Sequence, residues 1–313
     1  MFLEQTVASI LRCELPPDVE IEVVVALGGR APSETPNGVR VVTNPSGTIP
    51  DGLNLAIASS TGEVVVRVDS RCLVPPDHIA RVLDDLADPG LGCVGGAQLV
   101  LDRGVFGSAY ALAFNSVLMG PTVYRYRRAS GPVDTAYLGA WRRKDLESLG
   151  GFDPRMLRNQ DNELADRVRA SGKVVFYDAD LVVGYHNARD FRGAMAHHHE
   201  FGLWRMVQRE QGQRAFTPRH VAAVGVAALG AALGVGLIAN RSTRRCAVLG
   251  AAAAYIGAGT CARRSTGRLR RARPDIDGPP FHQLAPVIAP AVAAALDGAW
   301  LAGVIRGALK QRR

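Results

Sequence analysis

The chain has 313 residues, of which 47% are hydrophobic and 21% charged, so a disordered or collagen-like chain is excluded. This length suits one large α/β domain with an appendage, or two modest domains. Residues 241–313 contain 13 basic and 3 acidic side chains, whereas residues 1–240 contain 24 and 26, so the net charge of +8 comes from the C-terminal part.

The first 200 residues alternate between helix-like and strand-like segments. The run IEVVVA is continuous and β-branched, which is typical of a strand buried on both faces. Asn159 and Gly172 are the expected caps of one helix. This alternation predicts a mainly parallel sheet covered by helices on both faces. In chain order, we predict a helix at 2–12, a strand at 21–26, a helix at 50–59, a strand at 63–69, a helix at 76–88, a strand at 91–98, helices at 144–149 and 159–171, and strands at 173–177 and 181–185.

Three apolar runs follow residue 210. Residues 221–239 carry no charge over a length that can cross a bilayer, residues 246–262 are marginal, and residues 285–305 are interrupted by Asp297. We predict a membrane-associated helical region at 211–313; the alternative is a buried helical hairpin of a soluble domain. The arginines flank these runs, which favours membrane phospholipid over nucleic acid as the partner.

The charges between these apolar runs do not determine which way the runs are oriented across a membrane. If residues 1–210 are cytoplasmic, the six arginines of 263–273 lie inside, but a third full span places the basic C-terminus outside. Either the first two runs form a re-entrant hairpin, or one segment lies flat at the interface.

Two groups of acidic residues stand where an α/β sheet collects ligands. Asp69 follows a predicted strand, and the carboxyl ends of strands are the usual ligand-binding edge. Asp161 and Glu163 lie in the first turn of a predicted helix, where the helix dipole favours ionised carboxylates. For Asp69 the alternative is a strand-end turn or cap, and for the helix it is dipole complementarity alone.

Two long motifs resemble family 2 glycosyltransferases, most of all the subgroup of succinoglycan-type exopolysaccharide synthesis. The first is RVVTNPSGTIPDGLNLAIASSTGEVVVRVDSRCLVPPDHI, and the second is VDTAYLGAWRRKDLESLGGFDPRMLRNQDNELADRVRASGK. The segment FGLWRM at 201–206 is similar to a further part of that subgroup. The resemblance covers residues 1–210 and implies a GT-A type fold, a nucleotide-diphosphate sugar donor and inversion at the anomeric carbon.

The resemblance also implies roles for single residues. Asp161 matches the catalytic base, and Asp69 matches the first acid of a motif that holds Mg²⁺ or Mn²⁺ against the donor diphosphate. On the donor side it implies Gly28, Asn54 and Arg71. Arg71 stands where the wider family has Asp and the subgroup His; it cannot ligate a metal but can contact diphosphate oxygens.

On the acceptor side the resemblance implies Asp134, Glu163 and Trp204. The stretch 105–131 shows no clear period and is expected to be a flexible loop near the acceptor. His186 is a candidate metal ligand whose alternative is a structural histidine. Leu27 replaces an acid that reads the nucleobase in the family, and the family's first strand is missing before residue 1.

These features predict an inverting glycosyltransferase at the cell membrane, with its catalytic domain in the cytoplasm. It would transfer a sugar from a nucleotide sugar to a lipid-linked or glycan acceptor in cell-surface or exopolysaccharide synthesis, and would bind no nucleic acid. The departures at Leu27 and Arg71 keep an alternative open, which is a catalytically impaired relative acting as a membrane scaffold or nucleotide-sugar sensor.

Overall fold

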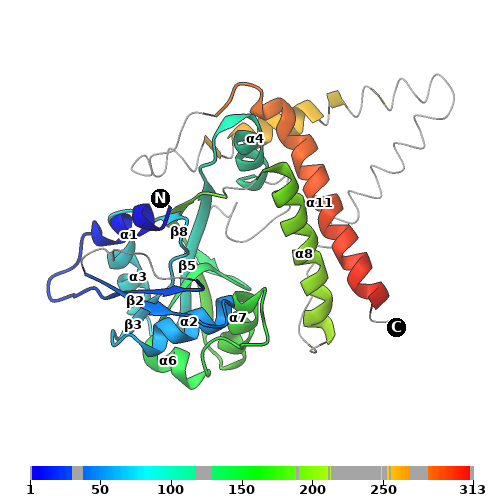
Figure 1. Cartoon of the computed structure of the whole chain (residues 1–313). Coiled ribbons are helices and arrows are strands. Elements are labelled where there is room, and N and C mark those ends of the chain that lie inside the picture. The colour runs from blue at the N-terminus through cyan, green and yellow to red at the C-terminus, as the bar shows by residue number, and fades with distance from the viewer. Residues whose placement is uncertain are drawn as a thin grey trace. The chain divides into compact units, whose positions relative to one another are not determined.

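The computed structural model describes residues 2–29, 38–116, 129–187, 190–210, 212 and 281–310, and most of 252–267 together with Val248. The predicted run 221–239 lies outside the described residues, and the run 246–262 is described only in part. The chain forms two compact units (Figure 1). The first comprises residues 1–98 and 127–185, and the second comprises residues 99–126 and 186–313.

The elements of the first unit agree with the predicted ones at most positions. The two strands predicted at 173–177 and 181–185 form one strand, Val174–Tyr185. Four strands were not predicted: Val39–Thr43, Cys72–Leu73, Gly131–Pro132 and Tyr137–Arg142. In chain order the elements are α1 (Phe2–Leu11), β1 (Val23–Leu27), β2 (Val39–Thr43), α2 (Ile49–Ala58), β3 (Val64–Val66), β4 (Cys72–Leu73), α3 (His78–Leu86), β5 (Leu91–Val100, whose last two residues belong to the second unit), β6 (Gly131–Pro132), β7 (Tyr137–Arg142), α6 (Arg143–Ser148), α7 (Gln160–Ala170) and β8 (Val174–Tyr185).

The mixed α/β fold has a central sheet, but the expectation of a mainly parallel sheet is wrong. The six-stranded sheet has the order β3-β7-β5-β8-β4, with β6 also paired to β8. The pairs β3–β7 and β5–β7 are antiparallel, because β7 lies between β3 and β5 against their direction. The pairs β4–β8 and β6–β8 are antiparallel too. The pair β1–β2 is parallel and forms a separate sheet among the described residues.

Close backbone approach inside the central sheet explains one of its glycines. A Cβ on Gly96 of β5 would overlap the carbonyl of Leu181 on β8, so no larger residue fits there. Around this contact, β5, β7 and β8 contribute to a core with Val82 and Leu86 of α3. This packing fixes the ends of β3 and β7, where the candidate site lies.

The second unit contains α4 (Gly104–Phe114), α8 (Phe191–Glu210) and α11 (Ala285–Lys310). α4 falls in the predicted loop 105–131, of which residues 117–128 are outside the described part. Because α4 is apolar and buried around most of its circumference, it shows no helical period in the sequence. The second unit groups α4 and α8 with α11, which they contact. The domain boundary at residue 210 stays a prediction.

By length and composition, α11 is a candidate membrane span. It is 26 residues long, and its mean hydropathy reaches 1.7 over an 18-residue window. Among the described residues no other helix is both long and apolar enough. The third predicted apolar run, at 285–305, therefore corresponds to one continuous helix.

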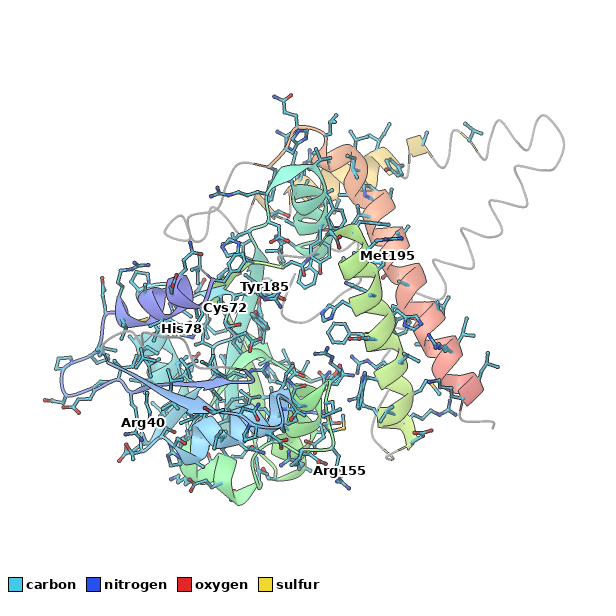
Figure 2. All side chains as sticks on the ribbon, in the orientation of Figure 1. Arg40, Cys72, His78, Arg155, Tyr185 and Met195 are labelled. Atoms are coloured by element: carbon cyan, nitrogen blue, oxygen red, sulfur yellow. The ribbon has the colours of Figure 1, made fainter. Side chains whose placement is uncertain are left out.

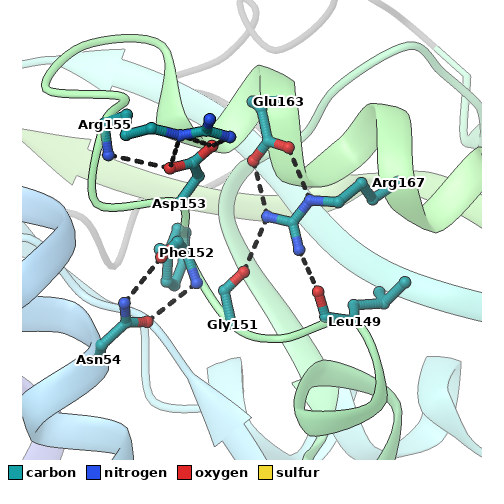
Figure 3. A network of polar contacts seen from close by, with 8 residues as sticks. All are labelled: Asn54, Leu149, Gly151, Phe152, Asp153, Arg155, Glu163 and Arg167. Carbon is teal, nitrogen blue, oxygen red and sulfur yellow. Dashed lines mark hydrogen bonds and ion pairs between the residues drawn. The ribbon is translucent and has the colours of Figure 1, made fainter.

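Polar contacts attach the loop before α7 to the rest of the first unit (Figure 3). Asn54 of α2 donates its amide N–H to the carbonyl of Phe152 at 2.7 Å, and its Oδ1 accepts the Phe152 N–H at 2.9 Å. Arg167 of α7 donates to the carbonyls of Leu149 and Gly151 and makes a two-bond ion pair with Glu163, both N–O distances being 2.6 Å. The loop is thus held from two helices, and α7 is fixed at its N-terminal end.

We expect Glu163→Gln to lower the free energy of unfolding by about 2–3 kcal/mol, because the Arg167 guanidinium loses its counter-charge in a mostly buried pair. The Glu163 and Arg167 side chains are 9% and 29% exposed, which places the effect below that of a fully buried pair. Urea unfolding followed by circular dichroism measures the change.

The matched control is Glu147→Gln. Glu147 also pairs with an arginine four positions away on a helix, Arg143, but at 3.4 Å and with its side chain 59% exposed. This variant should lose less than about 0.5 kcal/mol. Equal losses in the two variants would contradict the role assigned to the Glu163–Arg167 pair.

Candidate functional site

Asp69 lies in a tight turn immediately after β3. Arg67 N–H donates to the carbonyl of Gly139 on β7 at 3.2 Å, so the β3–β7 pairing continues to this point. The carbonyl of Asp69 then accepts the Cys72 N–H at 3.0 Å, which closes the turn into β4. The Asp69 side chain is 38% exposed, and its Oδ1 accepts a hydrogen bond from Arg67 Nε at 2.9 Å.

Arg67 connects the two predicted site carboxylates. Its side chain is 11% exposed. Burial opposes its charge, but the neighbouring Asp69 and Asp161 carboxylates outweigh that cost, so the pKa of Arg67 is raised above its ordinary value. Asp69 and Asp161, 92 positions apart in the sequence, therefore both act on one buried guanidinium.

Asp161 lies in the first turn of α7 and is partly exposed. Its Oδ1 accepts the backbone N–H of Asn162 at 3.0 Å. Asn159 precedes the helix in the left-handed conformation, with φ of 59°, which asparagine tolerates better than most residues. Burial and then the Asp161 charge raise the pKa of Cys93 on β5, so Asp161 also acts electrostatically on the central sheet.

Arg71 follows Asp69 in the same turn. Its guanidinium carbon lies 5.3 Å from the centre of the Tyr185 ring, a cation–π arrangement. Tyr185 pairs with Cys72 across β8 and β4, and Figure 2 labels both residues. Burial, followed by the Asp69 charge, raises the pKa of Cys72 to about 12, so this thiol is protonated at neutral pH. The turn thus carries one carboxylate between two arginines.

Three of the predicted site residues make contacts within the fold. Asn54 and Glu163 belong to the loop contacts of Figure 3. A Cβ on Gly28 would lie 3.2 Å from the Cα of Gly47, so Gly28 permits the close approach of two backbone segments. Asp134 is exposed just before β7.

The remaining two predicted residues belong to the second unit. His186 is partly buried, and burial followed by the Arg103 charge lowers its pKa. Trp204 lies on α8 and is partly buried. The metal-ligand role of His186 and the acceptor-side role of Trp204 stay predictions.

Arg67 was missed from the sequence, although a signal for it was present. Residues 67 and 69 flank Val68 in an extended segment, and alternate residues of a strand point to the same side. A basic residue two positions before a candidate ligand is therefore a natural partner for it. The electrostatic effect of Asp161 on Arg67 depends on tertiary structure alone.

The donor set around Asp69 does not fit a protein-built metal centre. Within the described residues no three His, Cys, Asp or Glu side chains are grouped so that they could hold one ion. Asp69 Oδ1 is already bonded to Arg67, and Arg71 occupies the position where the resemblance expects another ligand. A turn in which the carboxylate is already paired with one arginine and is followed two positions later by another suits an anionic ligand better than a cation.

We expect Arg67→Met to lower the free energy of unfolding by about 2 kcal/mol at neutral pH, because Asp69 loses its partly buried ion-pair partner. Thermal unfolding measures the change. The control is Arg155→Met, since the Arg155 side chain is 82% exposed and its pairing with Asp153 should matter little. If Arg155→Met destabilises the protein as much as Arg67→Met, the Arg67–Asp69 pair does not have the role assigned to it.

Comparison with solved structures supports the fold. Mannosyltransferase PcManGT from Pyrobaculum calidifontis, in complex with GDP-Man and Mn²⁺, matches with a TM-score of 0.50 at 16% identity, over 99% of this chain and 84% of that one. GalNAc-T7 with UDP, GalNAc and Mn²⁺ gives 0.46 at 15% identity, over 59% of this chain and 41% of that one. S. aureus TarS gives 0.43 at 14% identity, over 64% and 37%. The likeness to PcManGT shows a GT-A-like fold.

The search of curated proteins gives no match. A protein-family model, that of glycosyl transferase family 21, matches residues 46–284, which is most of the chain. The match confirms the expectation of a glycosyltransferase, but it does not confirm family 2 or the exopolysaccharide subgroup. The chain belongs to glycosyl transferase family 21.

Proposed function

We propose that this glycosyltransferase moves a sugar from a nucleotide-diphosphate sugar to a hydroxyl of a membrane-associated acceptor, with inversion at the anomeric carbon. The observation that supports the proposal is that both carboxylates belong to one unit of the fold: Asp69 follows β3 and accepts a hydrogen bond from Arg67 Nε at 2.9 Å, and Asp161 is partly exposed in the first turn of α7. Both charges, that of Asp69 first, favour the charged form of the buried Arg67. PcManGT, which has a similar fold, was solved with the nucleotide sugar GDP-Man.

Asp161 is the proposed base. It is partly exposed, and its position in the first turn of α7 favours the ionised carboxylate. The acceptor oxygen attacks the anomeric carbon while its proton passes to Asp161, and the bond from that carbon to the diphosphate oxygen breaks. The electron pair of that bond leaves with the diphosphate. A carboxylate suffices for this step, because proton transfer accompanies attack.

Arg71 is the proposed contact of the departing diphosphate. Arg71 adds a positive charge to the turn that carries Asp69, beside the ring of Tyr185. A guanidinium offers several donors in a fixed plane, which match phosphate oxygens. A divalent cation held by Asp69 is the alternative, since PcManGT was solved with Mn²⁺.

The acceptor and the cellular location complete the proposal. Asp134 is exposed next to β7 and is kept as an acceptor-side residue, with Trp204 of α8 as a further one. The long apolar helix α11 supports a membrane location, and a lipid-linked glycan acceptor on the cytoplasmic face fits that location. A role in exopolysaccharide synthesis rests on the sequence resemblance.

We expect Asp161→Asn to lower the rate of sugar transfer by about 10²–10⁴-fold, because the amide cannot accept the acceptor proton. Transfer is measured with radiolabelled nucleotide sugars and membranes that contain the variant. Donor binding, followed by thermal shift, should be unchanged.

The control is Asp166→Asn on the same helix, where the carboxylate pairs with Arg169 and is 36% exposed. This variant should transfer sugar at the wild-type rate. Undiminished transfer by Asp161→Asn would reject Asp161 as the base. A wild-type protein that binds a nucleotide sugar without transferring it would favour the sensor or scaffold alternative.

We expect a chelator to leave the transfer rate within about twofold of its value without chelator, because Arg71 replaces a metal ligand. Arg71→Met should raise the KM for the donor about tenfold, whereas Arg40→Met, in an exposed pair with Glu22, should not change it. Initial rates with and without EDTA give the effect of the chelator, and initial rates at several donor concentrations give the KM values of the variants. If EDTA abolishes transfer and Mn²⁺ restores it, a cation at Asp69 carries this role.

A further inference from the structure

One whole face of α11 is apolar and exposed. Its exposed positions recur every three or four residues, which is the spacing of a single helical face. We call this face the apolar stripe; it consists of Leu284, just before the helix, and of Val287, Ala291, Ala294, Gly298, Ala302, Ile305 and Leu309. A helix facing water would carry charged residues at such positions.

The opposite face of α11 packs closely against α8. A Cβ on Gly202 of α8 would overlap the carbonyl of Trp300, and a Cβ on Gly303 of α11 would overlap the carbonyl of His199. A Cβ on Gly307 would lie 2.8 Å from Cγ of Met206. His199 lies against Gly303 and, two turns later, Met206 lies against Gly307, so the two helices run parallel and in backbone contact (Figure 1).

Because α8 packs against α11, the composition of α8 determines whether the two helices can cross a membrane together. If α11 crossed a bilayer in this packing, α8 would cross beside it. α8 has charged or titratable side chains along its length: Arg192, His197, His198, His199, Glu200, Arg205, Arg209 and Glu210. Burying this series in hydrocarbon is strongly unfavourable. The α8–α11 packing is therefore compatible with α11 at a membrane surface and not with α11 across a membrane.

An apolar groove lies next to the N-terminal half of the stripe. It is formed by residues of all three helices, including Phe106 of α4, Phe191 of α8 and Ile288 of α11, and its volume is about 410 Å³. Ala291 belongs to both the groove and the stripe. The exposed Val105 and Phe191 enlarge the apolar surface there.

Basic side chains at the C-terminal end of the apolar stripe indicate the kind of partner that covers it. Arg306 and Lys310 are exposed and directly follow Ile305 and Leu309. Basic side chains at the margin of an apolar helical face match anionic headgroups above an acyl layer. Of the 13 large hydrophobic side chains exposed in the described part of the chain, 9 belong to the second unit, so this apolar surface is concentrated there.

We propose that α11 lies in the plane of an anionic phospholipid bilayer, with the apolar stripe in the acyl region and Arg306 and Lys310 at the headgroups. α8 then remains on the aqueous side. This arrangement rests on helix packing and surface composition and does not depend on the proposed sugar transfer. It assigns the occupant of the stripe and resolves the orientation conflict by placing the third apolar run flat at the interface.

Single cysteines at the two ends of α11 test the arrangement. Cys13, Cys246 and Cys261 are first changed to serine, which leaves the fully buried Cys72 and Cys93. Gln283→Cys and Lys310→Cys are then labelled with a membrane-impermeant maleimide in sealed right-side-out and inverted vesicles. An in-plane helix gives both cysteines the same sidedness. A spanning helix gives them opposite sidedness, which overturns the proposal.

A second measurement identifies the occupant of the stripe. The full chain with Ala294→Cys carries a fluorophore and is placed in vesicles of phosphatidylcholine and phosphatidylglycerol with brominated acyl chains. Quenching should be several-fold stronger than for the matched control Glu200→Cys on the exposed face of α8. Equal weak quenching at both positions overturns the proposal. A disulfide-linked dimer formed through Ala294→Cys would instead assign the stripe to a second copy of the chain.

Discussion

The turn that carries Asp69 depends on one largely buried ion pair. The Arg67 side chain is 11% exposed, and its Nε donates a hydrogen bond to Asp69 Oδ1 at 2.9 Å. A lone guanidinium at this place would be costly, because burial opposes its charge. The Asp69 charge and then the Asp161 charge outweigh that cost and raise the pKa of Arg67, so the turn after β3 and the first turn of α7 are linked electrostatically.

Several polar side chains of the first unit hold backbone in position. Asn54 makes two hydrogen bonds with the backbone of Phe152, and Arg167 donates to two loop carbonyls while pairing with Glu163. Backbone groups that are withdrawn from water need such partners, because leaving them unpaired would be costly. Asn54 and Glu163 thus have a structural role in the loop before α7, whatever their part in binding.

The second unit uses a different principle. Glycines at the α8–α11 contact allow the backbones to approach, so dispersion contacts of small residues hold a polar helix against an apolar one. This packing uses one face of α11 and leaves the other apolar and exposed. The two units therefore differ in the kind of surface that they present, since the exposed large hydrophobic side chains gather on the second one.

Local patterns in the sequence were sufficient for β1, α3, α7 and the two acidic positions 69 and 161, because periodicity, caps and strand ends are properties of neighbouring residues. The sequence alone did not reveal α4, because a helix buried on most sides has no amphipathic period. It did not reveal the antiparallel β7 either, because strand direction depends on pairing with residues that are distant in the sequence. Tertiary structure alone joined Arg67 to Asp161 and Asn54 to Phe152, residues more than 90 positions apart. Such contacts arise only when the chain folds, and no local pattern of residues encodes them.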